Sequence, residues 1–282
     1  MQNDKNKTEK IKTFAKKLTA KIIIDDLFSA ANDLTYKIFF SLFPFTIFLM
    51  SVVGFFKLDA DFLTGEISSV LPNAISQLAQ TVIKEIITVR SANILSFSLF
   101  VSVFTASSGF KTAMRSINKA YGQKDTRKIF IKVLISMILV LIFTVIIIIS
   151  FIIPIFGGGI LNFIEAWFNL DYLDYLNLFN MFIGLRYIIS ILIMFFSVIL
   201  INKLALSRKA KIKSLIPGSV FTVFSWMAIN ALFNFYIEHF SNYPSVYGSI
   251  TGIIILMLWL NIMCIGLLLG SEINATVEIL NK

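Results

Sequence analysis

The sequence predicts an all-α polytopic membrane protein with six transmembrane helices and further amphipathic helices at the membrane surface. Three observations predict this class. Of the 282 residues, 57% are hydrophobic, and the mean hydropathy of +0.84 is well above that of a soluble domain. Long uncharged runs recur, and the twenty residues from Ile250 to Leu269 can cross a hydrocarbon core of about 30 Å as a helix. The loops that hold most of the Lys and Arg alternate with loops that hold few.

Residues 1–33 are predicted to form a cytoplasmic amphipathic segment, followed by a six-span bundle over residues 34–282. Apolar residues of the segment recur at helical spacing, so they share one face while the lysines lie elsewhere: Ile11, Phe14, Leu18 and Ile22. This pattern fits a helix that lies on the membrane and is attracted to anionic lipid. It fits equally a solvated helix that packs against the bundle.

The first span is predicted over Leu34–Phe56, and Pro44 within it predicts a kink because proline removes one backbone hydrogen bond. The loop over residues 57–93 has apolar residues at helical spacing, which predicts a second helix at a membrane surface. The second span, Ile94–Phe110, is short and carries stripes of small residues, which favour contact with another helix.

Four more spans are predicted in the second half of the chain: Val133–Ile153, Leu185–Ile201, Leu215–Ile237 and Ile250–Leu269. The last of them and its edges carry two pairs of glycines spaced four apart, Gly248 with Gly252 and Gly266 with Gly270. Small residues at this spacing let a second helix backbone approach closely. The last span is therefore expected to pack inside the bundle.

The distribution of basic residues predicts the orientation in the membrane. Of 25 Lys and Arg, 21 fall on the side that holds both termini, three fall in the opposite loops, and Arg186 lies at a span edge. Short loops rich in Lys and Arg stay in the cytoplasm, so both termini are predicted to be cytoplasmic. Arg186 is expected to form an external ion pair with Glu238, although snorkelling to the headgroups is the alternative.

Short motifs occur in order along almost the whole chain: Leu34–Tyr36 with Phe40–Pro44, Asn118–Arg127 (NKAYGQKDTR), Ile216–Gly218, and Tyr247–Ser249 with Gly270–Ala275. Together they resemble the YihY/BrkB family, which was once labelled ribonuclease BN. The resemblance implies six spans in the bacterial cytoplasmic (inner) membrane and a role in the cell envelope. It implies no particular reaction.

The sequence argues against an enzyme. It contains one His, His239, and one Cys, Cys264, and neither has a partner at the spacing of a metal site. No Gly-rich phosphate-binding loop and no cluster of metal-binding carboxylates is present in the sequence. We therefore expect no catalytic residue, no metal or other cofactor and no nucleic-acid partner.

Polar residues within the last two spans are the candidate site. Asn230 and Asn234 are spaced by four and share one side of a helix, and Asn261 and Glu272 share nearly one face of the last helix. Facing lipid would be costly, so these four residues are expected to face protein or water. They are predicted to line a polar groove for an amphiphile, or to form hydrogen bonds between helices.

Two functions fit these observations. One is a transporter or flippase-like protein that moves an envelope lipid or other amphiphile, with membrane lipids as its partners. The other is a noncatalytic membrane scaffold that organises the envelope. A groove that joins Asn230, Asn234 and Asn261 would favour transport, whereas a closed bundle with an exposed face of small residues would favour a scaffold. We expect transport.

Overall fold

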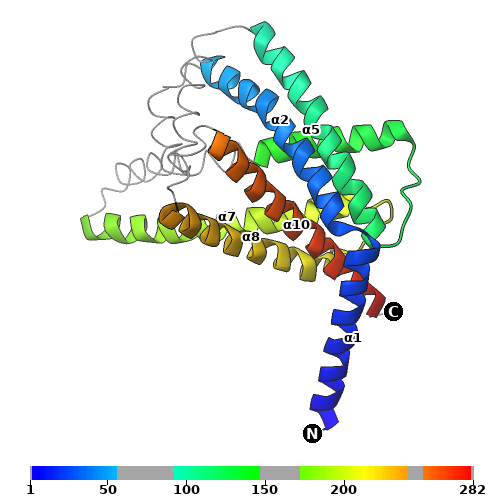
Figure 1. Ribbon diagram of the computed structural model, residues 1–282. Helices are drawn as coiled ribbons and strands as arrows, with labels where there is room; N and C mark the ends of the chain where they lie inside the picture. Colours follow the sequence, from blue (N-terminus) through cyan, green and yellow to red (C-terminus); the bar gives the residue numbers. More distant parts are fainter. Residues whose placement is uncertain (1, 56–91, 147–171, 241–249, 281–282) are drawn as a thin grey trace.

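The computed structural model describes residues 2–55, 92–146, 172–240 and 250–280, and nearly all of them are helical (Figure 1). The helices are α1 (Gln2–Ile24), α2 (Leu27–Phe55), α5 (Ala92–Ala120), α7 (Tyr172–Ala205), α8 (Ile212–Phe240) and α10 (Ile250–Leu280), with one more over Ile129–Ile146. Gly248 and most of the surface helix predicted over residues 57–93 lie outside the described residues.

Four helices of this part are long and apolar enough to cross a membrane, over Ile129–Ile146, Ile188–Ala205, Ile212–Tyr236 and Gly252–Leu280. They correspond to the third to sixth predicted spans. The first and second predicted spans lie in α2 and α5, which are not among these four helices. A helical membrane protein is therefore confirmed, and the total of six spans stays a prediction.

Helix α10 lies at the centre of the described helices. It contacts α1, α2, α5 and α8, while α2 also packs along α5 and α7 packs against α8 (Figure 1). A shared core joins small and aliphatic side chains of five helices, among them Ala31, Ala113, Val198, Val223 and Cys264. The last helix runs on to Leu280, past the end of the predicted span at Leu269, and its later polar residues Ser271, Glu272 and Asn274 are buried.

The N-terminal helix α1 extends away from the bundle, and its last turns lie beside the C-terminal part of α10 (Figure 1). Residues 11–22 are helical, as their spacing predicts. α1 ends at Ile24, and a turn with a positive φ of 52° at Asp26 leads into α2 at Leu27. Residues 27–33 therefore belong to the helix that holds the first predicted span. α2 runs through Pro44, and the kink there stays a prediction.

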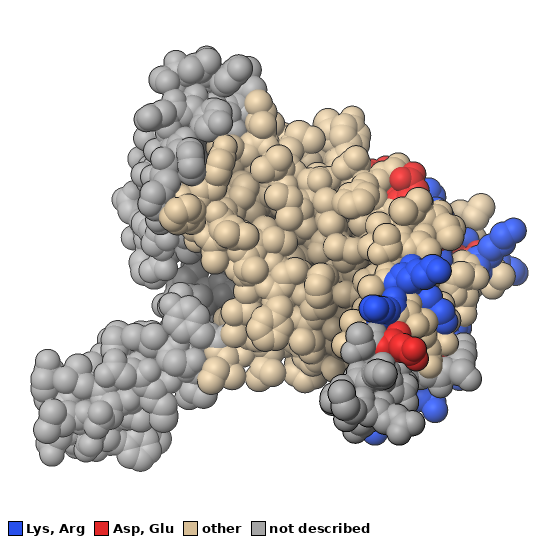
Figure 2. Space-filling model, turned by 60° about the horizontal axis from the view of Figure 1, so that its bottom comes forward, with Lys and Arg blue, Asp and Glu red and all other residues tan. Residues whose placement is uncertain are grey.

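Charged side chains gather toward one end of the molecule and leave a broad uncharged surface beside them (Figure 2). We call this the basic end; it comprises α1, the last turns of α5, α7 and α10, the loops over residues 121–128 and 206–211, and the first turns of α8. Elsewhere, large apolar side chains such as Phe97, Phe130 and Leu232 point outward, which suits a surface in contact with lipid.

Candidate functional site

An apolar cavity of about 400 Å³ lies between α2, α5, the Ile129–Ile146 helix, α7, α8 and α10. Its wall is made of aliphatic and aromatic side chains, including Phe45, Phe110, Phe143, Trp226 and Trp259. Among the described residues that line it there is no Lys, Arg, Asp, Glu or His. Such a wall suits a hydrocarbon chain and disfavours a charged group, which would lose its hydration without gaining a partner.

The polar atoms of the cavity wall are largely engaged within the protein. Trp259 Nε1 donates a hydrogen bond to Asn230 Oδ1 at 2.9 Å, and Trp226 Nε1 donates to the carbonyl of Met263 at 2.9 Å. Ser41 Oγ donates to the carbonyl of Ile38 at 2.7 Å, within its own helix. The amide of Asn230 is exposed, so it is the polar group of the wall best placed to meet a ligand.

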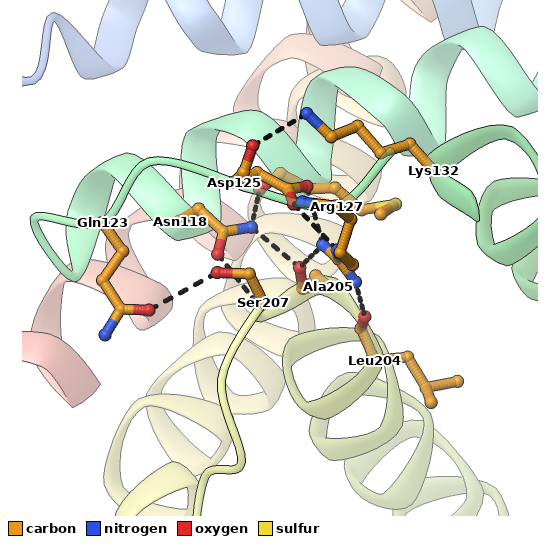
Figure 3. Close-up of polar contacts among 9 residues, drawn as sticks. Asn118, Gln123, Asp125, Arg127, Lys132, Leu204, Ala205 and Ser207 are labelled. Carbon is orange, nitrogen blue, oxygen red and sulfur yellow. Dashed lines mark hydrogen bonds and ion pairs between the residues drawn. The ribbon is translucent and has the colours of Figure 1, made fainter. Parts of the chain in front are cut away.

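At the basic end, the end of α5 and the following loop hold the end of α7 (Figure 3). α5 stops because Gly122 takes a left-handed conformation with φ of 64°. Asn118 Nδ2 donates to the carbonyl of Ala205 at 2.8 Å, and Asn118 Oδ1 accepts from the backbone N–H of Ser207 at 2.8 Å. The last carbonyls of a helix lack partners within that helix, so this buried amide supplies one.

Arg127 completes this cap. Its guanidinium donates to the carbonyls of Leu204 at 3.1 Å and Ala205 at 2.6 Å, and it binds both carboxylate oxygens of Asp125 at 2.9 and 2.8 Å (Figure 3). Lys132 Nζ donates to the backbone carbonyl of Asp125 at 2.9 Å. Burial acts to raise the pKa of Asp125, but hydrogen bonds and charge from Arg127 outweigh it, so that pKa lies below its ordinary value.

Helices α8 and α10 touch backbone to backbone where Gly218 meets Gly270. The N–H of Gly218 donates to Asn274 Oδ1 at 2.6 Å, and Thr222 Oγ1 donates to the carbonyl of Gly266 on α10 at 3.3 Å. A Cβ atom on Gly266 would come within 2.9 Å of Ser225 Oγ, so this glycine also allows close approach. These contacts belong to the type that holds helices together in a bilayer, where lipid competes equally well for apolar side chains.

The four residues of the predicted groove lie in different places. Asn230 lines the cavity, and Asn234 is exposed one turn farther along α8. Asn261 Nδ2 donates to Asn32 Oδ1 at 2.7 Å and to Thr35 Oγ1 at 3.2 Å, which joins α10 to α2. Glu272 is buried at the basic end, where Lys21 Nζ lies 3.1 Å from Glu272 Oε2. The cavity thus includes one of the four residues.

Three other predicted positions add little to this site. Gly252 is buried within α10. The side chains of Arg186 and Glu238 lie outside the described residues, so their ion pair stays a prediction.

Sequence reasoning missed the two tryptophans of the cavity wall and the polar contacts of the basic end. One available signal was position: Trp226 and Trp259 fall in the middle of predicted spans, whereas Trp is enriched at the two membrane interfaces. A second signal was Asn118, the first residue of the motif Asn118–Arg127. It is a polar residue for which the sequence shows no nearby hydrogen-bond partner. A third signal was Asn202, a polar residue just past a predicted span. In the structure Asn202 Oδ1 accepts a hydrogen bond from Ser271 Oγ at 2.8 Å.

Comparison with known proteins covers almost the whole chain. Residues 19–281 match the family described as virulence factor BrkB. Over 267 residues the chain is 30% identical to the ribonuclease-like protein YfkH of Bacillus subtilis (strain 168), which spans 94% of this chain and 95% of that protein. Over 45 residues it is 49% identical to a UPF0761 membrane protein of Tolumonas auensis, a stretch of 16% of this chain and 15% of that one.

A second UPF0761 membrane protein, PSHAa0171 of Pseudoalteromonas translucida, is 31% identical over 80 residues, which cover 28% of this chain and 27% of that protein. No solved structure matches the chain. The resemblance that the short motifs indicate is thereby confirmed, and the chain belongs to the BrkB virulence-factor family of membrane proteins.

Proposed function

We propose that this protein takes the apolar part of an amphiphile into its cavity and moves an envelope lipid or other amphiphile in the bacterial cytoplasmic membrane. The observation that carries the proposal is the cavity itself. Its volume of about 400 Å³ lies within the range of small-molecule sites, and its described wall is uncharged. In this proposal both termini and the basic end face the cytoplasm, as the positive-inside rule predicts.

The affinity in this proposal comes from packing and from one amide. A hydrocarbon chain gains little by leaving lipid for an apolar protein surface, because both surroundings are equally free of water. A fitted wall of aromatic rings adds dispersion contacts, and the exposed amide of Asn230 offers a hydrogen bond to a headgroup that enters with the chain. The ligand is therefore recognised by shape at its tail and by polarity at one point.

The proposed movement needs no chemical step by this protein. The uncharged wall offers no acid, base or cation next to a bound amphiphile among its described residues. We therefore assign no catalytic residue.

A noncatalytic scaffold is the second candidate, and one observation favours it. Asn261 and Glu272, which the sequence places in a groove, instead join α10 to α2 and to α1. Polar residues used in this way hold helices together whether or not anything moves through the bundle.

The test fills the cavity. The full chain is reconstituted in liposomes, and movement of a fluorescent lipid analogue is followed with an impermeant quencher. Ala106→Phe places a ring in the cavity wall, whereas Ala228→Phe makes the same change at an exposed position on α8. We expect Ala106→Phe to slow the movement and Ala228→Phe to leave it unchanged, with both variants folded.

A direct binding measurement complements this assay. Trp226 and Trp259 line the cavity, so a brominated amphiphile that enters should quench their fluorescence in a Trp167→Phe background. The quenching should decrease in Ala106→Phe. Equal quenching and equal lipid movement in all three proteins would overturn the proposal in favour of the scaffold.

A further inference from the structure

Three helices meet around one lysine at the basic end. Lys21 of α1 places its Nζ 3.2 Å from Asp25 Oδ2 and 3.1 Å from Glu272 Oε2 of α10. The same ammonium donates to the carbonyl of Ala120, the last residue of α5. One cation therefore faces two carboxyl groups, and this cluster has no part in the cavity.

The carboxyl group of Glu272 is the most buried of the cluster and is incompletely satisfied. Its side chain is 4% exposed, against 13% for Asp25 and 17% for Lys21. Although the Lys21 ammonium is near, Glu272 Oε2 accepts no well-directed hydrogen bond from any described residue. Glu272 and Asp25 also line a void of about 10 Å³ with Ser116 of α5, which is close to the smallest space that holds one water.

The other charged groups nearby do not balance the negative charge of the Asp25 and Glu272 carboxyl groups. From α5, Lys119 Nζ donates to the backbone carbonyl of Asp25 at 2.6 Å, but the Lys119 side chain is exposed and its charge is screened by water. Arg208 lies beyond the cluster, paired with Glu278 and stacked over the ring of Tyr121. Burial raises the pKa of Tyr121, so its hydroxyl stays neutral.

We propose that Asp25 and Glu272 form a proton-binding site that holds one exchangeable proton between their carboxyl groups. Two carboxylates beside a single ammonium carry an excess negative charge, and a buried excess charge is costly. Uptake of one proton from water leaves one neutral carboxyl group and one carboxylate, which pairs with Lys21. Carboxyl pairs that share a site titrate in this way as a unit.

This site gives the bundle a link between proton binding and helix packing. α10 carries Glu272 at one end and contributes Cys264 and Leu267 to the cavity wall. The other two groups are Lys21 of α1 and Asp25 in the turn that follows α1. A change in protonation therefore alters the contact between α1 and a helix that lines the cavity. The cluster would bind this proton whether or not the chain moves a lipid.

Infrared spectroscopy of the full chain in lipid nanodiscs tests the proposal. We expect a carboxylic acid band, shifted by deuterium exchange, that persists above about pH 6, where exposed Asp and Glu have lost their protons. The band should disappear in Glu272→Gln and also in Asp25→Asn, because a shared proton needs both carboxyl groups. It should remain in Glu278→Gln, which makes the same change elsewhere on α10.

A second variant gives a shift with a defined sign. Lys21→Met removes the cation that favours the ionised form, so the midpoint of the band should rise by about one pH unit or more. Lys17→Met, at an exposed position on the same helix, should leave the midpoint unchanged. Size-exclusion chromatography and circular dichroism verify the fold of each variant.

Two results would overturn the inference. One is the absence of any such band in the unmodified protein. The other is a band that survives either Glu272→Gln or Asp25→Asn in folded protein. Because Asp25 lies in the turn after α1, outside the central helices, its variant keeps the test decisive even if Glu272→Gln fails to fold.

Discussion

The cavity and the basic end are built from the same helices but with opposite kinds of side chain. α5, α7, α8 and α10 contribute to both regions. In the cavity they leave about 400 Å³ of apolar space, whereas at the basic end they approach closely through glycines, buried amides and ion pairs. In a bilayer, close packing and hydrogen bonds are what favour helix contact. We therefore expect the contacts of the basic end to stabilise the fold, and the cavity to be available to bind a ligand.

The largest expected effect tests the closest contact of the basic end. Gly270→Ala would place a Cβ atom in steric overlap with Thr222 and with the backbone of Gly218. Backbone atoms cannot move aside as a flexible side chain can, so we expect a loss of about 3 kcal/mol or more in the free energy of unfolding.

The matched control is Gly109→Ala at the cavity, where the new Cβ would meet Ile38 Cγ1 at 3.6 Å, an ordinary contact. Thermal unfolding of both variants in one detergent makes the comparison. Equal losses of stability in Gly270→Ala and Gly109→Ala would show that the basic end is no more closely packed than the cavity.

The second test removes the cap of α7. Asn118→Leu leaves the backbone N–H of Ser207 without its acceptor and removes one donor from the carbonyl of Ala205. Since Asn118 and Ala205 are buried and Ser207 is half-buried, the free energy of unfolding should fall by about 2 to 3 kcal/mol. Gln123→Ala, which loses a contact of 3.5 Å to Ser207 Oγ, should have almost no effect in the same denaturation experiment.

The third test separates two asparagines that the sequence treats alike. Asn261→Leu removes hydrogen bonds to Asn32 and Thr35 and should cost about 1 kcal/mol, the typical size of such contacts in membranes. Asn234→Leu alters an exposed position and should change the free energy of unfolding very little. A larger loss in the free energy of unfolding for Asn234→Leu than for Asn261→Leu would contradict the placement of Asn261 between two helices and of Asn234 at the surface.

The smallest expected effect is a change in how the stability of the protein depends on pH. Because the pKa of Asp125 is lowered in the folded protein, its contribution to stability is complete above the ordinary value of 3.8 and is lost as pH falls through the lower folded value. Asp125→Asn should therefore be less stable than the unmodified protein at neutral pH and should lose less on acidification below about pH 4. The exposed change Glu9→Gln serves as control, and a parallel fall in all three proteins would argue against this role.

Much of the fold could be predicted because a membrane helix is specified locally. A long uncharged run such as Ile250–Leu269 satisfies its backbone hydrogen bonds within itself, which is the condition for crossing a bilayer. The uncharged run ends at Leu269, where Gly270 and Glu272 bring in polar groups, although helical spacing already places Glu272 on the last helix. In the structure this helix runs on to Leu280, and the two residues are buried against α8 and α1.

The candidate site was harder to predict than the helices. Spacing shows that Asn230 and Asn234 share a side of one helix, but not that Asn230 lines the cavity and Asn234 does not. The cavity wall itself is made of ordinary apolar residues, and nothing in their local pattern distinguishes a wall from a packed core.

The order of residues along the chain was enough to predict the class of protein, the extent of most helices and the gathering of charge at one end. Each of these depends on neighbours along the chain, through helical hydrogen bonds, hydropathy and the sign of nearby charges. The folded bundle was needed to see that Lys21 contacts Glu272, that Asn32 contacts Asn261, and that a cavity remains beside Trp259. These contacts join residues more than 200 positions apart or depend on how six helices cross, and helix crossing is set by side-chain packing that no single segment contains.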